Sequence, residues 1–466
     1  MKIVMIHTYD YYEPLGLMTL SAFLKKYGNS CDLIDIKLEK NYIQKIQEIK
    51  PDIIAYSVTS NNWKYYYDIN LNLKKHLSFF SIFGGAHPTF FPDLIYENKI
   101  DAICRGEGEY AFKELAYALE HNEDYSGIKN LWVKQNAEEV IKNDLRPLIQ
   151  DLDSLPFPDR DLIDKYKHYR KRSRIRTITS RGCPFSCTYC FNHAYRKIYK
   201  GKGKYVRQRS PAHVIEELKR LKKRYSPNNF EFHDDIFSIK NSWLQEFVKL
   251  YLSEKINIPF EVNLRPNFIN EESVSLLKKA GCYSVQFGVE SGNDYLRNEV
   301  LHRNISRDIM INAASLLRLY GIKINTYNLI GIPEETMSSV VETIKFNSQL
   351  NVNYAMNCIY QPYPGTKLSE YAINSGYYTG DFNELGKNYL YGKSAIHSKD
   401  GKRIERMHYL FSYGVKFPFL IPLLLFLSRL PLNGLYQALY FFYRAYSVIF
   451  IFKRLRIREA FIRERI

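Results

Sequence analysis

Three cysteines stand close together in the middle of the chain, at spacings of four and three residues. They are Cys183, Cys187 and Cys190, and they follow the strand-like run 175–179. Three thiolates this close together predict one metal centre. His193, three residues after Cys190, could complete a zinc site, but closed zinc sites usually draw their ligands from two turns rather than one loop. A 4Fe–4S cluster held by three thiolates would instead leave one iron open.

The loop from Arg181 to Cys190 resembles the signature loop of the radical S-adenosylmethionine (SAM) superfamily, in which an aromatic residue, here Tyr189, precedes the last cysteine. The resemblance implies that Cys183, Cys187 and Cys190 bind three irons of a 4Fe–4S cluster while SAM chelates the fourth. Reductive cleavage of SAM then gives a 5'-deoxyadenosyl radical, which takes hydrogen from an unactivated carbon. Because this chemistry belongs to the cofactors, the protein must position them, shield them and receive electrons.

Residues 1–125 alternate short apolar runs with amphipathic ones, which predicts a doubly wound parallel sheet. Ligands of such sheets bind at the carboxyl ends of the strands, where this sequence places loops rich in glycine and small hydroxyl residues. Together with the cysteine loop, these features resemble the cobalamin-binding domain of the cobalamin-dependent radical SAM enzymes, over nearly all of residues 1–375. The resemblance implies cobalamin contacts from Ser57, Thr59, Gly84, Gly85 and Glu107.

Two features depart from the expected pattern of a cobalamin protein. The DxHxxG element, which supplies a histidine to cobalt in other cobalamin proteins, is absent, as it commonly is in this radical SAM class. His87 lies inside the loop 84–89, and we expect it to have a structural role rather than to bind cobalt. The loop 7–13 lacks the prolines often seen after the first strand of the family. A Gly-Gly turn also serves as an ordinary strand-to-helix turn, so that alternative stays open.

From residue 176 to residue 375, longer strand and helix patterns alternate six times. The predicted strands are Arg176–Ser180, Asn229–His233, Phe260–Asn263, Ser284–Gly288, Lys323–Leu329 and Tyr354–Ile359. They match the partial (β/α)6 barrel that the resemblance implies, in which chemistry occurs at the carboxyl ends of the strands. The residues that the resemblance places beside SAM are Tyr189, Asp234, Asp235, Glu290, Ser291 and Gly331. Asp234 and Asp235 could equally cap the next helix, and Arg265 could face the SAM carboxylate or a substrate anion.

Composition divides the chain into four parts. Prolines at 155–160 exclude a helix interior, and the short apolar runs within 130–145 predict a hairpin before them. We expect a Rossmann-like cobalamin-binding domain at 1–145, a linker at 146–175, a radical SAM barrel at 176–375 and a helical, apolar and basic extension at 376–466. The predicted fold class is therefore α/β, with an α-helical C-terminal part.

The extension contains an apolar segment at 417–427, which is short and broken by prolines and is therefore a poor membrane-spanning helix. An aromatic run at 435–452 then meets a basic run at 453–465, a pattern typical of helices at a membrane surface. The alternative is a helical cap that buries those aromatics against the barrel. The net charge is +17, and its concentration beside apolar residues favours a membrane surface over nucleic acid, for which no motif is present.

Seven cysteines without a disulfide framework, and an N-terminus that begins directly with a strand-like run, predict a cytoplasmic protein. We expect an enzyme that methylates an unactivated carbon of a lipid, isoprenoid or natural-product-like substrate. An electron donor such as flavodoxin or ferredoxin would reduce it, and it would associate peripherally with the inner face of the membrane. Radical cyclisation or rearrangement with the same cofactors is one alternative, and a non-catalytic cobalamin or iron-sulfur sensor is another.

Overall fold

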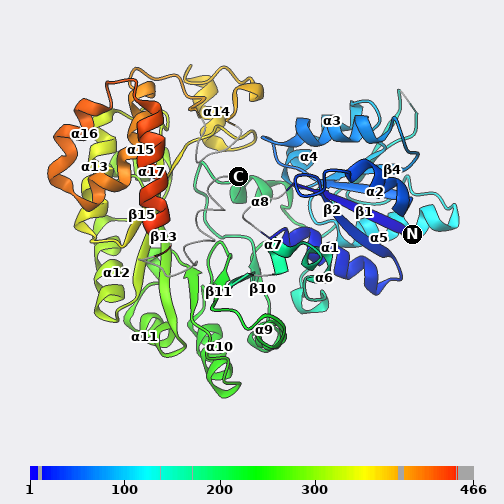
Figure 1. Cartoon of the computed structure of the whole chain (residues 1–466), viewed down its shortest axis with the longest axis horizontal. Helices are drawn as coiled ribbons and strands as arrows, with labels where there is room; N and C mark the ends of the chain where they lie inside the picture. The colour runs from blue at the N-terminus through cyan, green and yellow to red at the C-terminus, as the bar shows by residue number, and fades with distance from the viewer. Residues whose placement is uncertain (9–12, 137, 171, 387–392, 448, 450–466) are drawn as a thin grey trace. The chain divides into compact units, whose positions relative to one another are not determined.

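The computed structural model describes residues 1–8, 13–136, 138–170, 172–386, 393–447 and 449. These residues form two compact units, the first drawn from residues 1–171 and 198–205 and the second from residues 172–197 and 206–466. In Figure 1 the first unit begins in blue, and α17 (Asn433–Tyr446) of the second unit is red. The predicted basic run 453–465 and the end of the predicted aromatic run lie outside the described residues, as does most of the loop 7–13.

The first unit is built on a seven-stranded sheet of order β2-β1-β3-β4-β5-β6-β7. Its strands are β1 (Lys2–His7), β2 (Ser30–Asp35), β3 (Ile53–Ser57), β4 (Phe80–Gly84), β5 (Ala102–Cys104), β6 (Leu131–Lys134) and β7 (Val140–Lys142). The strands β1 to β5 pair parallel, whereas β6 and β7 form the predicted hairpin and pair antiparallel. The helices of this unit are α1 (Leu15–Lys26), α2 (Tyr42–Ile49), α3 (Trp63–Leu73), α4 (Ala86–Phe90), α5 (Glu109–His121), α6 (Asp161–Asp164) and α7 (Lys167–Arg170), with short 3-10 turns η1 (Pro92–Tyr96) and η2 (Leu152–Ser154).

Both faces of this sheet are buried, which is why its central parallel strands β1 and β3 are largely apolar. In β1, Ile3 and Met5 pack in a core with α1 and α5, while Val4 and Ile6 pack in a second core with α2 and α3. The strand β1 lies between β2 and β3, so the direction of winding reverses beside it. Ligands of doubly wound sheets bind at such a switch point, outside the carboxyl ends of the strands.

The second unit is built on a six-stranded parallel sheet of order β15-β14-β13-β12-β11-β8. Its strands are β8 (Arg174–Thr177), β11 (Asn229–Phe232), β12 (Phe260–Asn263), β13 (Cys282–Glu290), β14 (Lys323–Ile330) and β15 (Tyr354–Ile359), and β9 (Ser180–Arg181) and β10 (Arg207–Gln208) form a separate antiparallel pair. The helices are α8 (Phe191–Ile198), α9 (Pro211–Tyr225), α10 (Asn241–Ser253), α11 (Glu271–Lys279), α12 (Arg307–Leu319), α13 (Met337–Gln349), α14 (Lys367–Asn374), α15 (Gly401–Lys416), α16 (Ile421–Leu427) and α17 (Asn433–Tyr446). Short turns η3 (Pro266–Phe268), η4 (Leu296–Val300, a π-helix), η5 (Phe382–Glu384) and η6 (Pro418–Leu420) join them.

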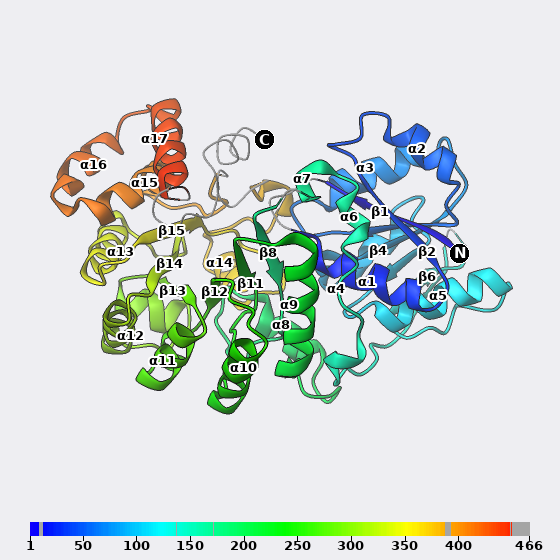
Figure 2. The same cartoon turned by 60° about the horizontal axis from the view of Figure 1, so that its bottom comes forward.

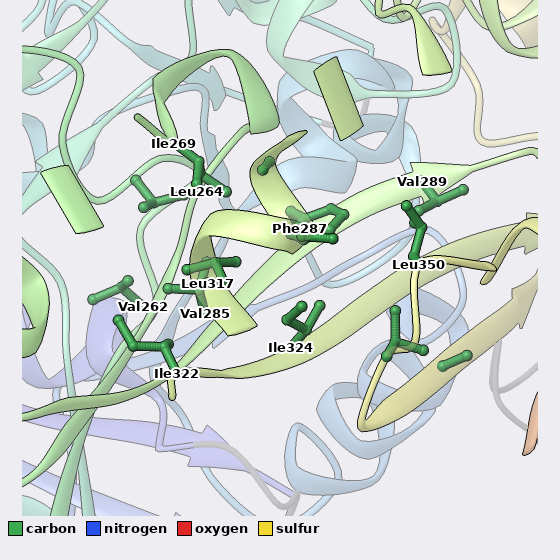
Figure 3. Close-up of a cluster of buried hydrophobic side chains, with 14 of the residues drawn as sticks. Val262, Leu264, Ile269, Val285, Phe287, Val289, Leu317, Ile322, Ile324 and Leu350 are labelled. Carbon is green, nitrogen blue, oxygen red and sulfur yellow. The ribbon is translucent and has the colours of Figure 1, made fainter. Parts of the chain in front are cut away.

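Helices α9 to α13 follow one another along one side of the curved sheet (Figure 2). This is the partial barrel expected from the sequence, and the predicted α/β fold class is confirmed. Alternate residues of a strand point to opposite faces, and β13 uses both faces. Val285, Phe287 and Val289 pack in the apolar core that the helices cover (Figure 3). Gln286 and Glu290 lie on the other face, where they line a cavity.

Local capping sets where the barrel helices begin. Ser210 accepts the His213 N–H with its side chain, and Pro211 occupies the first turn of α9, where its missing N–H costs nothing. Thr336 and Ser339 form a reciprocal capping box at the start of α13. These caps fix the ends of the loops that connect strands to helices, and so they fix the loops that carry the strand-end polar groups.

The first barrel strand is shorter than predicted. The strand β8 stops at Thr177, because beyond it the Thr179 N–H and the Ser180 hydroxyl both donate to the carboxylate of Asp234. Ser180 then pairs with Gln208 in the separate β9–β10 ladder. The sequence pattern could not show this exit from the sheet, because a carboxylate more than fifty residues away causes it.

The C-terminal helices pack on one another and on the last barrel elements, with α15 against α13 and β15 and with α17 against α15. Tyr436 and Tyr440 of α17 are buried, and the Tyr440 ring lies 5.2 Å from that of His408. The helical-cap alternative is therefore right for these two aromatics, whereas Leu435 and Phe442 are exposed. Among the residues that the structure describes, no helix has the length and hydropathy needed to cross a membrane.

Candidate functional site

The three cysteines lie on one loop between β9 and α8. Cys187 is buried, and Cys183 and Cys190 are half-buried. Gly182 opens the loop with φ of +88°, a left-handed conformation that glycine adopts without strain. The Cys190 N–H donates to Cys187 O at 3.1 Å, and the Cys183 N–H donates to Oδ1 of Asn192 at 3.1 Å. These bonds to the backbone and to the Asn192 side chain shape the loop, and all three cysteines face one cavity.

The loop suits a cluster better than a single metal ion. Within the described ranges, no three side chains of His, Cys, Asp or Glu lie close enough together to share one ion. The cysteines of a 4Fe–4S cluster bind separate irons, so they stand farther apart than the ligands of one zinc ion. Nδ1 of His193 lies 3.0 Å from Cys187 O, and its Nε2 accepts the Lys367 N–H at 3.2 Å. Because both ring nitrogens have backbone partners, the zinc alternative is not supported.

A cavity of about 250 Å³ lies beside this loop, at the carboxyl ends of the barrel strands. All three cysteines line it. Of the residues that we predicted beside SAM, four also line it: Tyr189, Asp234, Asp235 and Glu290. The remaining polar lining residues are Asn192, His233, Asn263, Arg265, Gln286, Arg303 and Tyr327. The cavity is therefore polar, and it carries charged groups of both signs.

Glu290 is the centre of a charged network in this cavity. Its Oε1 accepts the Tyr189 hydroxyl at 2.8 Å and lies 3.8 Å from Nη2 of Arg303. Burial raises the pKa of Glu290, and the opposing effects of Arg303 and Tyr189 do not cancel it. Glu290 has φ of +64°, which is strained for a side chain larger than glycine. A Cβ on Gly288 would lie 2.0 Å from Glu290 Oε1, so only glycine leaves room for this carboxylate.

Arg303 connects Glu290 to the cysteine loop. Its Nη2 donates to Gly288 O at 2.7 Å, and its Nη1 lies 3.9 Å from Sγ of Cys187. Although burial disfavours its charge, Tyr189 and Glu290 hold the pKa of Arg303 above its ordinary value. A cation that donates toward a cluster sulfur is one of the means by which proteins tune cluster reduction potentials.

Two arginines present unpaired donors to the cavity. Nε of Arg303 and Nη1 of Arg265 are buried and have no hydrogen-bond partner among the described residues. The Arg265 guanidinium also lies over the Phe185 ring, 3.5 Å from its centroid, which holds the charge in place. Buried, unpaired guanidinium donors are costly unless an anion satisfies them. The arrangement therefore suits a carboxylate or phosphate bound in the cavity.

The adjacent aspartates have different partners. Asp234 accepts from the N–H and hydroxyl of Thr179 and from Ser180, whereas its Oδ2 is buried without a partner. Burial raises the pKa of Asp234 to about 6, against the lowering effect of these bonds. Asp235 accepts from Nδ2 of Asn192 at 3.1 Å, and burial raises its pKa as well. Neither aspartate caps the following helix, which begins at Asn241.

Ser291 and Gly331 do not line the cavity. The Ser291 hydroxyl accepts the Asn293 N–H at 3.2 Å and so shapes the turn after β13. Gly331 has φ of +73°, and its N–H donates to Oε2 of Glu335. Burial raises the pKa of Glu335 to about 8. Both predicted residues therefore act on the shape of strand-end loops.

In the first unit, the predicted cobalamin residues lie where the parallel strands end. Ser57 ends β3, and both Ser57 and Thr59 are exposed. Gly85 has φ of +99°, and a Cβ there would lie 2.8 Å from Val58 O. The β3 and β4 loops thus approach each other closely, which explains the glycine. Gly84 ends β4 and has no such constraint, because its nearest neighbours would be 3.9 Å away.

Glu107 and His87 have structural partners. The Glu107 carboxylate accepts the Ile149 N–H at 2.8 Å, which ties the loop after β5 to the segment that follows the hairpin. The His87 ring stacks on Trp63 and Phe91, with centroid separations of 5.2 and 5.0 Å. Burial lowers the pKa of His87 to about 4. These contacts agree with the structural role that we predicted for His87.

The loop after β5 holds a second close approach. Gly106 has φ of +73°, and a Cβ there would lie 1.6 Å from the Tyr199 hydroxyl oxygen. That hydroxyl accepts the Glu107 N–H at 3.2 Å. Tyr199 is buried and belongs to the short stretch 198–205, which the chain contributes to the first unit after the cysteine loop. Glycine at 106 therefore makes room for an aromatic ring rather than for a ligand.

Several cavity residues were not predicted from the sequence. Asn263, Gln286 and Tyr327 alternate with core residues on β12, β13 and β14, so a period-of-two reading of those strands could have found them. Asn192 follows the last cysteine by two residues and lies 3.5 Å from Cys190 Sγ. Arg303 follows a π-helix, and no local pattern identifies it.

Two family models match the chain: the Radical SAM superfamily over residues 177–346 and the B12 binding domain over residues 1–116. Among curated proteins, an uncharacterized methyltransferase of Pyrococcus horikoshii is 34% identical over 370 residues, which cover 77% of this chain and 78% of that protein. An anaerobic magnesium-protoporphyrin IX monomethyl ester cyclase of Rubrivivax gelatinosus is 25% identical over 374 residues, covering 77% of this chain and 66% of that protein.

Solved structures with the same architecture include the radical SAM methyltransferase TsrM from Kitasatospora setae, with cobalamin and a [4Fe-4S] cluster bound. It matches with a TM-score of 0.65 and 18% identity, over 80% of this chain and 75% of that one. The cobalamin-dependent SAM radical enzyme OxsB, with aqua-cobalamin bound, matches with a TM-score of 0.64 and 20% identity, over 84% and 57%. At these identities the likeness establishes the fold.

Proposed function

The chain belongs to the radical SAM enzymes that carry a B12-binding domain, whose cofactors are a 4Fe–4S cluster, SAM and cobalamin, and from that premise we propose that it methylates an unactivated carbon. When bound, these groups supply a carbon-centred radical and a transferable methyl group. The observation that carries the proposal is the cysteine loop, which lies beside a polar cavity at the carboxyl ends of the barrel strands.

We assign the cluster to Cys183, Cys187 and Cys190. The loop presents all three side chains to one cavity, and His193, the next candidate ligand along the sequence, has backbone partners at both ring nitrogens. An open coordination position is what a substrate-like ligand of the cluster needs. Asn192 and Arg303 lie near two of the cysteine sulfurs, and they would stabilise the charge that the cluster gains on reduction.

We assign SAM to the same cavity. Tyr189, Asp234, Asp235 and Glu290 would contact it directly, because all four line the cavity. The two carboxylates with raised pKa values could accept hydrogen bonds from its amino and hydroxyl groups, and the unpaired donors of Arg265 suit its carboxylate. Ser291 and Gly331 would contribute through the loops that they shape.

We assign cobalamin to the carboxyl edge of the first-unit sheet, within the predicted domain 1–145. Ser57 and Thr59 offer exposed hydroxyls at the end of β3, beside the switch point of the sheet. Gly85 lets its loop approach the backbone of Val58 closely, Gly84 ends β4 beside it, and Glu107 anchors the loop after β5. None of these residues offers an imidazole to cobalt, in agreement with the missing DxHxxG element.

The substrate class is the finer part of the proposal. We propose a lipid, isoprenoid or similarly apolar natural product, supplied at the cytoplasmic face of a membrane, because the described helices between residues 417 and 446 expose large apolar side chains. An external one-electron donor such as flavodoxin or ferredoxin would reduce the cluster, because neither the cluster nor cobalamin is itself a net source of electrons.

The direct test is anaerobic incubation of reconstituted protein with SAM, cobalamin, a reductant and cellular lipid extract, followed by mass spectrometry. Methyl transfer replaces one hydrogen of the substrate with a methyl group, so it predicts a product heavier by CH2 together with both deoxyadenosine and S-adenosylhomocysteine. Deoxyadenosine without S-adenosylhomocysteine would contradict methyl transfer. The same experiment distinguishes methyl transfer from radical cyclisation, because cyclisation adds no methyl group. Cyclisation is the second candidate because the chain is similar to the Rubrivivax gelatinosus cyclase.

The cluster assignment has its own test. Cys187→Ala should lose the visible absorbance of the cluster and the cleavage of SAM while keeping the circular dichroism of the folded chain. Cys282→Ala is the matched control, because Cys282 is also buried but lies at the start of β13, away from the cavity. Unchanged SAM cleavage in Cys187→Ala would contradict the assignment.

A further inference from the structure

The C-terminal helices expose an unusual number of large apolar side chains. Phe419 is 77% exposed, Phe442 60% and Phe426 57%. Every phenylalanine in the described ranges that is this open to solvent lies between residues 417 and 446. We call the following set the apolar cap surface: Phe417, Phe419, Leu423, Phe426, Leu432, Leu435, Phe442 and Tyr446. Exposed apolar residues gathered in one segment usually mark an interaction site, whereas scattered ones need no explanation.

The spacing shows that packing inside the unit does not require these side chains. In the segment of η6 and α16, the exposed residues Phe419, Leu423 and Phe426 follow helical spacing, while Ile421 and Leu424 are buried. Each helix therefore has one apolar side that anchors it to the protein and another that faces solvent. The outward apolar side is not needed for folding.

The helix α17 repeats this arrangement. Leu435, Phe442 and Tyr446 are exposed at helical spacing, while Tyr436 and Tyr440 are buried against α15. The aromatic residues of the helix thus divide into an inner set that is buried as a cap and an outer set, Phe442 and Tyr446, that remains exposed to solvent. The buried aromatics match the predicted helical cap, and the exposed ones leave an apolar face on the same helix.

Charge indicates what covers the apolar cap surface. Between residues 406 and 449 the sequence contains four basic residues, Arg406, Lys416, Arg429 and Arg444, and no aspartate or glutamate. The sequence then continues into the basic run 453–465. Apolar side chains among cations, without acids, match an anionic lipid surface, which offers both an apolar interior and negative headgroups.

A groove of about 450 Å³ borders this surface and has the same chemistry. Its lining includes Arg318 and Lys416 together with the rings of Phe417, Tyr443 and Tyr446, and no acidic residue lines it. Phe417 precedes η6 and Tyr446 ends α17, so the groove connects the two exposed segments. Two cations beside amphipathic aromatic rings suit a phosphate-bearing headgroup at the membrane interface.

We propose that the apolar cap surface docks the protein on an anionic lipid membrane, with the groove of Arg318 and Lys416 holding a lipid phosphate. This rests on the proposed function in one respect: a lipid-derived substrate gives the docking a purpose. The contact is interfacial, in keeping with the short helices that carry it.

The test is flotation of the full chain with vesicles, without SAM or reductant, so that binding is measured separately from methyl transfer. The vesicles are phosphatidylcholine alone and phosphatidylcholine with phosphatidylglycerol. Wild type should float with the anionic vesicles and much less with neutral ones, and added salt should weaken binding. Phe419→Ser/Phe426→Ser should lose most of the bound fraction, whereas the matched control Tyr65→Ser/Tyr117→Ser, on exposed first-unit positions, should keep it.

The charge contribution is tested in the same assay. Lys416→Gln/Arg429→Gln should reduce flotation with anionic vesicles, and Lys223→Gln/Lys249→Gln, which removes two exposed charges from α9 and α10, should not. Wild type that floats with neither vesicle overturns the proposal. A Phe419→Ser/Phe426→Ser variant that floats like wild type also overturns it. If that variant loses self-association while its flotation is unchanged, the surface instead binds a second copy of the chain. Reductive cleavage of SAM to deoxyadenosine needs no vesicle and is measured separately, so failure of the docking proposal is distinguishable from failure of the proposed function.

Discussion

Glu335 offers a quantitative test of the loop that follows β14. Its side chain is 4% exposed, Oε2 accepts the Gly331 N–H, and Oε1 is buried without a partner among the described residues. Burial raises the pKa of this carboxyl from 4.5 to about 8, despite backbone donors from Gly331 and Ile332. The folded protein therefore prefers the neutral acid, while the unfolded chain ionises at its ordinary value.

The sign and size of the effect follow from linkage. A carboxyl whose pKa is raised by folding adds its full stability below the unfolded pKa, and this contribution is lost as pH rises toward the folded pKa. Each pH unit between the two pKa values costs about 1.4 kcal/mol. Between about pH 5 and about pH 7.5, Glu335 should therefore lower the free energy of unfolding by roughly 3 kcal/mol.

Glu335→Gln removes the ionisation and keeps an oxygen that can accept the Gly331 N–H. The variant should be similar to wild type near pH 5 and more stable by about 3 kcal/mol near pH 7.5. Urea unfolding of the cluster-free protein, followed by circular dichroism at both pH values, measures the difference. Glu246→Gln, on the exposed side of α10, makes the same charge change without burial and should show no such trend. Parallel pH dependence in wild type and Glu335→Gln would refute the reasoning.

Two further predictions concern the cavity and its support. Arg303→Met removes the cationic donor 3.9 Å from Cys187 Sγ, so the cluster should become harder to reduce; an unchanged midpoint potential in a redox titration followed by electron paramagnetic resonance would exclude this role. Gly292→Ala places a Cβ 2.6 Å from the backbone of α13 and should destabilise the second unit by about 1–3 kcal/mol in urea unfolding. Gly434→Ala, where a Cβ meets nothing within 4 Å, is its control and should not destabilise.

The sequence predicted best what depends on neighbouring residues. The strands β12 and β15 have the predicted bounds, because their apolar residues and flanking turns are local signals. The cysteine loop was recognisable because its spacing is specific. The strand β8 ends at Thr177 because the Asp234 carboxylate binds the backbone of Thr179. Asp234 is distant in sequence, so no local pattern predicts this contact.

The candidate site was harder to predict for the same reason. Sequence could place Glu290 and Ser291 together at the end of β13, but only the structure separates the one that lines the cavity from the one that shapes the turn. Arg303 reaches the same cavity from beyond a π-helix, 15 residues after the Gly288 carbonyl that it binds. The position of Arg303 depends on the path of the chain after the π-helix, and sequence periodicity does not predict that path.

The route of the chain limits how this enzyme can be taken apart. Soon after Cys190 the chain leaves the second unit, contributes residues 198–205 to the first, and then goes back. A C-terminal fragment that begins at residue 172 would contain Tyr199 but not Gly106, against which the Tyr199 ring packs. A chimera between relatives must therefore exchange residues 198–205 together with residues 1–171, because a swap at one junction would separate Tyr199 from the loop that it packs against.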